Sequence, residues 1–177
     1  IKKYKMFFID AKLEESGKII TAYTKNKGGF KKEMAPGNYV YVSFHDDPKR
    51  KTQYSVELID FNNTLSGVDP NLGGKLLKEY LKNSDIEIIK NEASIKDSRL
   101  DLKLKVGELE GFGEIKTVMT YDKNVARFPE AETPRGQKHL KLLTALAKKK
   151  IPAYLFYIVL VPQADSLYIL KEVDKEY

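Results

Sequence analysis

The sequence predicts a mixed α/β (α+β) protein in which a small all-β part precedes a part that combines helices and strands. Short segments rich in β-branched and aromatic residues, divided by turn signals, fill the first third of the chain. Two segments with helical periodicity follow. Because the pattern changes near residue 64, we expect two domains, 1–63 and 64–177. A chain of 177 residues that is 42% hydrophobic can bury a core in each.

Four segments of the first part have the composition of β-strands. They are bounded by turn signals such as Gly28-Gly29 and Pro36-Gly37. The segments are KMFFIDAKL, GKIITAYT, GNYVYVSF and TQYSVELIDF. In the third, Val40, Val42 and Phe44 alternate with other residues, which indicates a half-buried strand. Several short strands in succession predict a small barrel or a curled sheet.

Two helices are expected in the second part. The first covers about residues 70–82, with Asp69 as N-cap and Pro70 at the first helical position. The second follows Thr133 as N-cap, has Pro134 at its first position, carries a face of leucines and ends in lysines.

The strands of the second part are read from three segments. After a linker that follows the first helix, RLDLKLKV and GFGEIKTV form a predicted β-hairpin across GELEG. The continuous apolar run from Ala153 to Val161 predicts a central strand buried on both faces. SLYIL is a possible further short strand.

Composition limits the chemistry. Lys and Arg number 31 against 25 Asp and Glu, and the net charge of +6 favours a polyanionic partner such as nucleic acid, although a lysine-rich solvated surface gives the same count. No cysteine is present, so disulfides, thiolate zinc sites and cysteine nucleophiles are excluded. With only two histidines, any metal should be a hard cation held by carboxylates, Mg²⁺ or Mn²⁺.

We expect a cytoplasmic protein with no membrane partner. The longest apolar run, from Ala153, is far too short to cross a bilayer, and the opening IKKYKMFFID lacks the apolar region of a signal peptide.

Two charges, Glu114 and Lys116, lie within the apolar segment GFGEIKTVMT. Residues two apart on a strand share a face, so the pair forms one unit. A hairpin turn between Gly107 and Glu108 would put Asp101 opposite Glu114, whereas a turn centred on Leu109 would move it opposite Thr117.

If Asp101 does meet Glu114, the group has a chemical meaning. Two carboxylates repel each other unless a cation lies between them, and a lysine beside them would position water and stabilise charge on a phosphate. This is the chemistry of metal-dependent phosphodiester hydrolysis. The alternative is a solvated strand face with a surface salt bridge.

Further basic groups are candidates for binding a nucleic acid backbone. Lys49, Arg50 and Lys51 lie in a loop between two strands, where Asp46 and Asp47 cancel part of their charge. The free N–H groups of the helix beginning at Pro134, with Arg135 and Lys138, could hold a phosphate. His139 is either a phosphate or second-layer contact or a histidine satisfied at an interface.

Several long motifs resemble one known family. SRLDLKLKV, GEIKTV, ARFPEAETPRGQKHLKLL and HDDPKRKTQYSVEL occur in the order found in the sugar fermentation stimulation protein A (SfsA) family, and the resemblance extends over about residues 5–175. It implies an N-terminal OB-like barrel and a C-terminal domain of the PD-(D/E)xK nuclease type, a mixed sheet flanked by helices. It also implies DNA binding and a link to regulation of sugar (maltose) utilisation.

The resemblance assigns roles to particular residues. It implies that Asp101, Glu114 and Lys116 are catalytic and that Asp101 and Glu114 hold Mg²⁺ or Mn²⁺, helped by Glu92 or the backbone carbonyl of Ile115. The residues implied to contact DNA are Arg99, Arg135, Gln137, Lys138 and His139, in addition to Lys49, Arg50 and Lys51.

Three functions remain open at this level. The chain is a metal-dependent nuclease, a DNA-binding regulator without turnover, or a barrel that binds single strands or RNA beside an inert domain. The expected partner is DNA, double- or single-stranded and bound non-specifically. The oligomeric state is open, a homodimer included.

Overall fold

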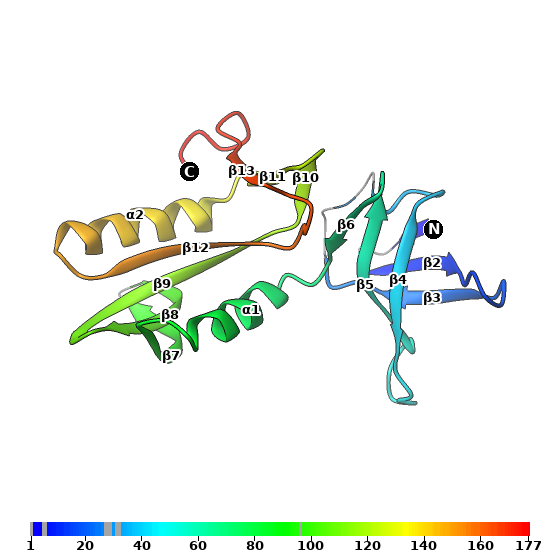
Figure 1. Ribbon diagram of the computed structural model, residues 1–177, viewed down its shortest axis with the longest axis horizontal. Helices are drawn as coiled ribbons and strands as arrows, with labels where there is room; N and C mark the ends of the chain where they lie inside the picture. Colours follow the sequence, from blue (N-terminus) through cyan, green and yellow to red (C-terminus); the bar gives the residue numbers. More distant parts are fainter. Residues whose placement is uncertain (1, 5–6, 27–29, 31–32, 96) are drawn as a thin grey trace. The chain divides into compact units, whose positions relative to one another are not determined.

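A computed structural model describes residues 2–4, 7–26, 30, 33–95 and 97–177 (Figure 1). The expected turn at Gly28-Gly29 lies outside the described residues. The chain divides into two compact units. The first contains Ile1–Pro70, Met119–Arg127 and Leu160–Tyr168, and the second contains Asn71–Val118, Phe128–Val159 and Ile169–Tyr177. Among the described residues, no helix is both long and apolar enough to cross a membrane.

The first unit is built on a sheet in which the described strands are ordered β1-β2-β3-β5-β4, with β6 paired to β5. The strands are β1 (Lys2–Tyr4), β2 (Phe8–Lys12), β3 (Ile19–Tyr23), β4 (Tyr39–Phe44), β5 (Tyr54–Phe61) and β6 (Thr64–Gly67). The four segments predicted as strands correspond to β2, β3, β4 and β5, which confirms them. Ile9, Ala11, Ile20 and Ala22 are buried on one face of the β2–β3 hairpin and form part of the core.

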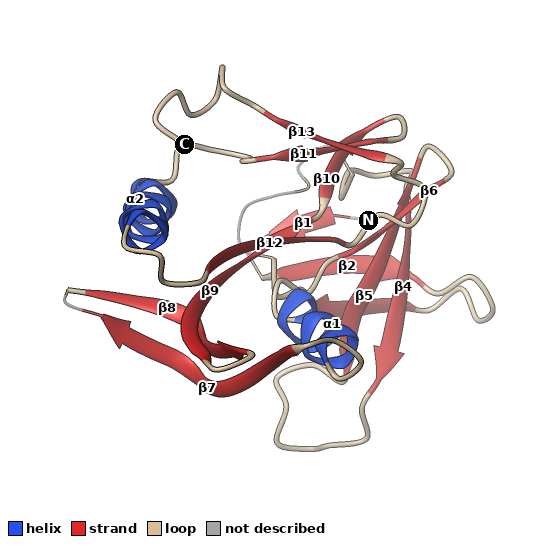
Figure 2. Ribbon diagram, turned by 60° about the vertical axis from the view of Figure 1, so that its left-hand side comes forward, coloured by secondary structure: helices blue, strands red, loops and turns tan. Residues whose placement is uncertain are grey.

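β5 pairs with three of the described strands. On one side its first residues pair with β3 and its last residues pair with β6. Tyr54 and Ser55 pair in parallel with β3, and Leu58–Phe61 pair with β6. β4 runs antiparallel along the other edge. Among the described strands no pairing joins β1 to β4, so the pairing pattern is that of a strongly curled sheet, the open form of the predicted barrel (Figure 2).

Two details of the first unit differ from the prediction. β6 pairs with β5, so residues 64–67 belong to the first unit, which continues to Pro70 beyond the expected boundary at residue 63. Phe44, which the alternation groups with Val40 and Val42, is 56% exposed, whereas the two valines are half-buried. A bulge between Tyr41 and Val42 breaks the alternation before it, and the Phe44 ring packs against Tyr54 instead.

A small separate sheet joins three segments that are distant in the sequence. Its order is β10-β11-β13, with β10 (Thr120–Asp122), β11 (Val125–Phe128) and β13 (Ser166–Ile169). The SLYIL segment is therefore a strand, as suggested, whereas the hairpin of β10 and β11 was not predicted. The Tyr121 hydroxyl donates to the carbonyls of Phe61 and Thr64, and burial raises its pKa to about 12.

The second unit is a mixed sheet in the order β12-β9-β8-β7, with a helix on each face (Figures 1 and 2). Its elements are α1 (Leu72–Leu81), β7 (Ile86–Ile95), β8 (Ser98–Val106), β9 (Leu109–Val118), α2 (Pro134–Lys148) and β12 (Ala153–Val159). The predicted hairpin is β8 with β9, which confirms it. The expected linker before it is instead the strand β7, whose mostly exposed side chains lie at the sheet edge.

Each helix covers its own side of the sheet. Leu77 and Leu81 of α1 pack in one cluster with Leu102, Leu104 and partly buried residues of β9 and β12. A second cluster joins α2 to the opposite face through Leu143, Leu146 and Leu100. On β12, alternate residues belong to the two clusters, so the apolar run reflects a strand covered on both faces. The expectation of a central strand is wrong, because β12 lies at the edge of the described sheet and its side chains are only half-buried.

The helix starts show one correct and one wrong prediction. α2 begins as expected: Thr133 accepts a hydrogen bond from Gly136 N at 3.1 Å and Pro134 follows. α1 begins at Leu72 with Asn71 as N-cap. The expected cap, Asp69, is therefore not the N-cap residue; it is buried and forms an ion pair with Lys25 of the first unit.

Close packing on β9 explains why a glycine, Gly73, lies in the first turn of α1. A Cβ at this position would lie 2.2 Å from Thr117 Oγ1 on β9, so only glycine allows this approach. Helix propensity is sacrificed locally for close packing of α1 on the strand that carries Glu114 and Lys116.

Candidate functional site

Glu114 and Lys116 lie on β9, and their side chains meet. Lys116 Nζ donates to Glu114 Oε1 at 2.6 Å. This contact is the consequence of strand geometry, since residues two apart project to the same face. The pair is not the solvated salt bridge that the alternative reading described, because the Glu114 and Lys116 side chains are only 4% and 14% exposed. An ion pair this deep is shielded from salt and water.

Asp101 lies on the neighbouring strand, β8. Its side chain forms a hydrogen bond with the backbone of Ile115, the residue between Glu114 and Lys116. The β8–β9 ladder pairs Val106 with Leu109 and continues to Leu102 opposite Gly113, so the turn lies at Gly107-Glu108, the first of the two predicted registers. Gly107 has φ +58°, which suits this tight turn. The regular pairing ends at Leu102 and Gly113, one residue before Asp101 and Glu114. There Asp101 Oδ2 accepts a hydrogen bond from Ile115 N at 2.8 Å.

A local irregularity in β8 accompanies this arrangement. Leu100, Leu102 and Leu104 are spaced two apart, which in a regular strand puts them on one face, but Leu100 packs with α2 and the other two with α1. The alternation is thus broken at Asp101. On the adjoining strand, Glu92 has φ +56°, between the pairs Asn91 with Leu102 and Ala93 with Leu100. Both strands are therefore distorted where Asp101 binds Ile115 N.

His139 adds a second partner for Glu114 from α2. Its Nδ1 lies 2.6 Å from Glu114 Oε1, and the residue is 3% exposed. Two roles were considered for His139: a phosphate or second-layer contact, and a histidine satisfied at an interface. The structure shows a buried contact with the Glu114 carboxylate. The other oxygen, Glu114 Oε2, is buried without a hydrogen-bond partner within the described part of the chain. A buried carboxylate oxygen without a donor is costly unless a cation or a bound group satisfies it.

The electrostatics of Asp101 agree with a cation-binding role. Burial raises its pKa, the Ile115 N–H opposes this, and the nearby Glu114 carboxylate raises the pKa further. Lys116 and His139 act in the lowering direction, yet the net pKa is raised. Two carboxylates thus influence each other across a half-buried site, and a divalent ion with oxygen ligands relieves such repulsion. The donor set of Asp101 and Glu114 Oε2 fits a hard cation.

The expected third ligand does not join them. Glu92 is 67% exposed at its side chain and lies 3.5 Å from Arg99 in a surface ion pair. Among the residues described, no group of three Asp, Glu or His side chains is gathered as a metal site. The prediction of Glu92 as a metal ligand is therefore not supported by the geometry. Glu92 lies on β7, a strand at the edge of the described sheet, and its backbone has φ +56°.

The residues expected to contact DNA at the start of α2 have different surroundings. Arg135 is exposed, and Lys138 Nζ donates to Asp97 O at 2.8 Å. Gln137 Nε2 is bound to Asp174 Oδ1 at 2.8 Å. The backbone N–H groups of Gly136 and Gln137 donate to Thr133, so two of the donors proposed for a phosphate are already used.

Asp174 is a residue whose role the sequence did not reveal. It is buried and accepts hydrogen bonds from Thr133 N, Gln137 Nε2, Glu176 N and Tyr177 N. Burial acts to raise its pKa, but these donors outweigh burial and hold the pKa below its ordinary value. The charged aspartate ties the C-terminal segment to the start of the helix that carries His139.

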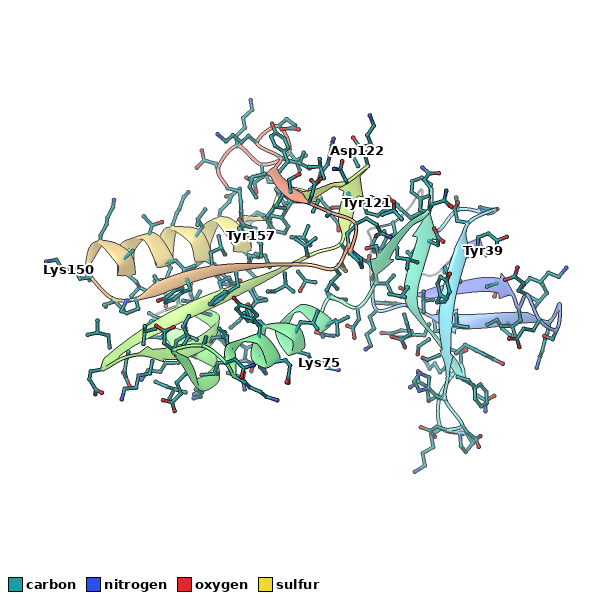
Figure 3. All side chains as sticks on the ribbon, viewed as in Figure 1. Tyr39, Lys75, Tyr121, Asp122, Lys150 and Tyr157 are labelled. Atoms are coloured by element: carbon teal, nitrogen blue, oxygen red, sulfur yellow. The ribbon has the colours of Figure 1, made fainter. Side chains whose placement is uncertain are left out.

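An aromatic cluster next to the site was also missed. Tyr157, expected to be a core residue, projects from β12 on the α2 side (Figure 3), and its hydroxyl donates to the Tyr177 hydroxyl at 3.1 Å. Both rings pack edge-on against Phe128. Burial raises the pKa of both phenols, and the charge of Glu114 adds to the effect on Tyr177. No sequence spacing relates these residues, because they meet only after α2 packs on the sheet.

The basic loop belongs to the first unit. Lys49, Arg50 and Lys51 are all exposed. Asp47 Oδ1 accepts from Lys49 N at 2.9 Å, and Arg50 N donates to Asp47 O, so the aspartate shapes the turn. Arg50 Nη2 also donates to Ser55 Oγ at 2.7 Å.

The fold and the site together define a class of protein: a curled β domain joined to an α/β domain that carries two carboxylates and a lysine on adjacent strands. Residues 1–68 match the family model described as the SfsA N-terminal OB domain. Residues 71–177 match the model described as the sugar fermentation stimulation protein RE domain. The chain belongs to the SfsA family.

Relatives agree along the full chain. The sugar fermentation stimulation protein homolog of Pelagibacter ubique is 37% identical over 185 aligned residues, which cover 100% of this chain and 79% of the relative. The homolog of Desulfotalea psychrophila is 32% identical, with 100% and 78% covered. A solved structure described as Pyrococcus furiosus SfsA in complex with Ca²⁺ is similar, with a TM-score of 0.80 and 26% identity over 99% of this chain and 77% of that one.

Proposed function

We propose that this chain binds DNA and hydrolyses phosphodiester bonds at Asp101, Glu114 and Lys116 with Mg²⁺ or Mn²⁺. The observation that carries the proposal is the buried Glu114 carboxylate, with Oε1 held by Lys116 and His139 and Oε2 without a partner in the described chain. The OB domain and the net charge of +6 support a nucleic acid as substrate.

The residues that would hold the cation are Asp101 and Glu114. When bound, a divalent cation neutralises the carboxylates and supplies a Lewis acid for the phosphate. The Pyrococcus furiosus relative, described in complex with Ca²⁺, supports this, because Ca²⁺ and Mg²⁺ share a preference for oxygen ligands.

The side chains of the protein have separate tasks in this proposal. The Ile115 N–H fixes Asp101, and His139 Nδ1 fixes Glu114, so both carboxylates are oriented before substrate arrives. Lys116 Nζ is held by Glu114 Oε1 and keeps two further N–H donors. With these it positions the attacking water and stabilises the negative charge that develops on the phosphate.

The test is cleavage of DNA by the full chain and by two lysine variants. Supercoiled plasmid and a single-stranded oligonucleotide are incubated with Mn²⁺, Mg²⁺ or EDTA. We expect cleavage with either metal and none in EDTA, and a loss of about 100-fold or more in Lys116→Ala. Lys103→Ala is the matched control. Lys103 lies on β8 in a surface pair with Glu110 at 2.8 Å, so this variant should cleave like the parent.

Two outcomes would overturn the enzyme proposal. Absence of nicking under all conditions would do so directly. Cleavage that persists unchanged in Lys116→Ala would show that the activity comes from a contaminant.

A DNA-binding protein without turnover is the second candidate. It is favoured by the lack of a third acidic or histidine ligand among the described residues and by the closed pair of Lys116 and Glu114. It predicts salt-sensitive DNA binding that is the same in the parent and in Lys116→Ala, with no cleavage by either.

A further inference from the structure

A hollow in the first unit combines aromatic and basic side chains. It has a volume of about 510 Å³ and is lined by Phe7, Phe8, Tyr23, Arg50, Lys51 and Thr52. This volume lies within the range of small-ligand sites. A second hollow of the same unit, beside Tyr39, contains Lys12 and Glu14, whose charges cancel. The first hollow therefore differs in combining aromatic rings with two basic side chains, and none of the described residues that line it is acidic.

The rings lie on the outer face of the β2–β3 hairpin. Phe8 pairs directly with Tyr23, so both project from the same side of the sheet. Ile9 and Ala22, the adjacent pair of the ladder, are completely buried on the opposite side. The core is thus built without Phe8 and Tyr23, which remain half-buried. Both rings lie on the outward face of the hairpin, where they line the hollow.

The rings are held in a fixed arrangement. Tyr23 stacks on Phe7, with ring centroids 6.0 Å apart and planes at 20°, and meets Phe8 edge-on at 6.0 Å. Thr24 N donates to Phe7 O at 2.8 Å, which fixes Phe7 beside Tyr23. The aromatic surface is therefore preorganised, and a flat ligand can bind it at a small cost in side-chain entropy.

The positive rim is anchored as well. Arg50 Nη2 donates to Ser55 Oγ at 2.7 Å and Arg50 Nε donates to Thr52 O at 3.3 Å. Thr52 Oγ1 in turn donates to Thr21 O on β3. These bonds hold the guanidinium at the hollow, while Lys51 beside it is exposed. An anionic group next to the aromatic surface would meet both cations.

We infer that this hollow binds an unpaired base of a single-stranded nucleic acid, with the base on the Phe7, Phe8 and Tyr23 rings and its phosphate on Arg50 and Lys51. Stacking on aromatic rings beside a basic groove is how single strands are held without sequence preference. A base inside a duplex is stacked on its neighbours and cannot present its face. The inference rests on the proposed nucleic acid binding and specifies strandedness and the residues that provide it.

A tryptophan reporter gives a direct test, because the natural chain contains no tryptophan. Tyr23→Trp puts a single indole in the hollow, and Tyr39→Trp puts one on β4, where Tyr39 is 62% exposed (Figure 3). Each variant is titrated with dT12, with U12, and with a 12-base-pair duplex in EDTA. We expect quenching of Tyr23→Trp by at least one single strand and much less by the duplex. Tyr39→Trp should change little with any of them.

Affinity measurements separate stacking from charge. Phe8→Leu keeps an apolar side chain but removes the ring, and it should weaken single-strand binding by about 5- to 150-fold. Tyr39→Leu is the matched control and should bind like the parent. A dT12 strand with abasic nucleotides should lose affinity for the parent by a similar factor. Melting temperatures of both leucine variants establish that they are folded.

Equal affinity of Phe8→Leu and the parent would overturn the inference, as would equal affinity for the abasic and normal strands. In either case duplex binding and cleavage can still be present, so the proposed function stands separately. Conversely, quenching of Tyr23→Trp without cleavage in any metal would refute the nuclease proposal and leave the hollow assigned.

Discussion

The two units place their cationic groups in opposite environments. Lys49, Arg50 and Lys51 lie on an exposed loop of the first unit, whereas the Lys116 side chain in the second unit is 14% exposed and bound to a buried glutamate. Exposed charges act on a polyanion at a distance and are screened by salt. A buried charge acts only on what reaches it, but with greater strength. The first arrangement suits capture of a nucleic acid and the second suits chemistry on one phosphate.

Carboxylates differ between the units in the same way. In the loop, Asp47 accepts from the Lys49 backbone N–H, so its main contribution is to the shape of the turn. In the second unit, Glu114 accepts from two charged or titratable side chains and keeps one oxygen unpartnered among the described residues. An acidic group can therefore organise the backbone or organise a site, and burial distinguishes the two.

The largest effect is expected from breaking the buried cluster. Glu114→Ala leaves Lys116 buried without its counter-charge, which should lower the free energy of unfolding by about 3 kcal/mol. This is the low end for a broken buried pair, because the Lys116 side chain is still 14% exposed and can reach water. Thermal unfolding should show a melting temperature about 6 to 12 °C lower.

Glu92→Ala is the matched surface variant in the same unit. Its partner Arg99 is 3.5 Å away and both side chains are more than half exposed, so the change should be within about 1 kcal/mol. Similar destabilisation by the two variants would contradict the contrast between a buried and an exposed glutamate.

The salt dependence of binding should give the next largest effect. Replacing Lys49, Arg50 and Lys51 by Gln removes three exposed charges, which should reduce the slope of log affinity against log salt by about 2 for a single strand. Between about 50 and 200 mM KCl, the affinity of the variant should therefore fall about 16-fold less than that of the parent. Fluorescence anisotropy with dT12 in EDTA measures both slopes.

Lys116→Gln tests the other half of this contrast. The charge of Lys116 is already neutralised by Glu114 at 2.6 Å, so Lys116 adds little to the counterions released when a nucleic acid binds. The slope of log affinity against log salt should therefore stay unchanged in this variant. A slope that falls equally in the Lys116 variant and in the loop variant would show that Lys116, like the loop residues, meets the nucleic acid backbone as a free charge.

Much of the fold was predictable because local signals agree with it. The four predicted strands of the first unit are rich in β-branched and aromatic residues and lie between turn signals, and α2 has both its cap and its proline. β7 was missed because most of its side chains are exposed at a sheet edge, which leaves little hydrophobic alternation to detect. Asp69 was misassigned because its ion pair with Lys25, 44 residues away, competes with capping.

The site was predictable only as far as strand geometry reaches. The contact of Glu114 and Lys116 follows from their spacing, and the position of Asp101 follows once the turn is fixed at Gly107. The contact of His139 with Glu114 depends on how α2 packs on the sheet, and no periodicity encodes that. The same limit applies to Glu92, which the sequence offered as a ligand but which lies exposed at the sheet edge.

The smallest effect is expected from Asp101, and its sign distinguishes a functional carboxylate from a structural one. Burial raises the pKa of Asp101 above its ordinary value of 3.8, with the Ile115 N–H opposing and Glu114 adding to the rise. A raised pKa in the folded state means that ionisation costs stability: the contribution is neutral below pH 3.8 and becomes unfavourable as pH rises through the folded pKa. Asp101→Asn keeps an oxygen for the Ile115 N–H but cannot ionise, so it should melt at a higher temperature than the parent at neutral pH, and the difference should vanish as pH falls toward 3.8.

Adding Mg²⁺ should stabilise the parent alone and narrow or reverse the difference in melting temperature between the parent and Asp101→Asn. Asp47→Asn, which keeps the acceptor for Lys49 N on the exposed loop, should change the melting temperature far less. If Asp101→Asn melts below the parent at neutral pH without metal, the aspartate is held for stability and no longer supports a cation beside Glu114.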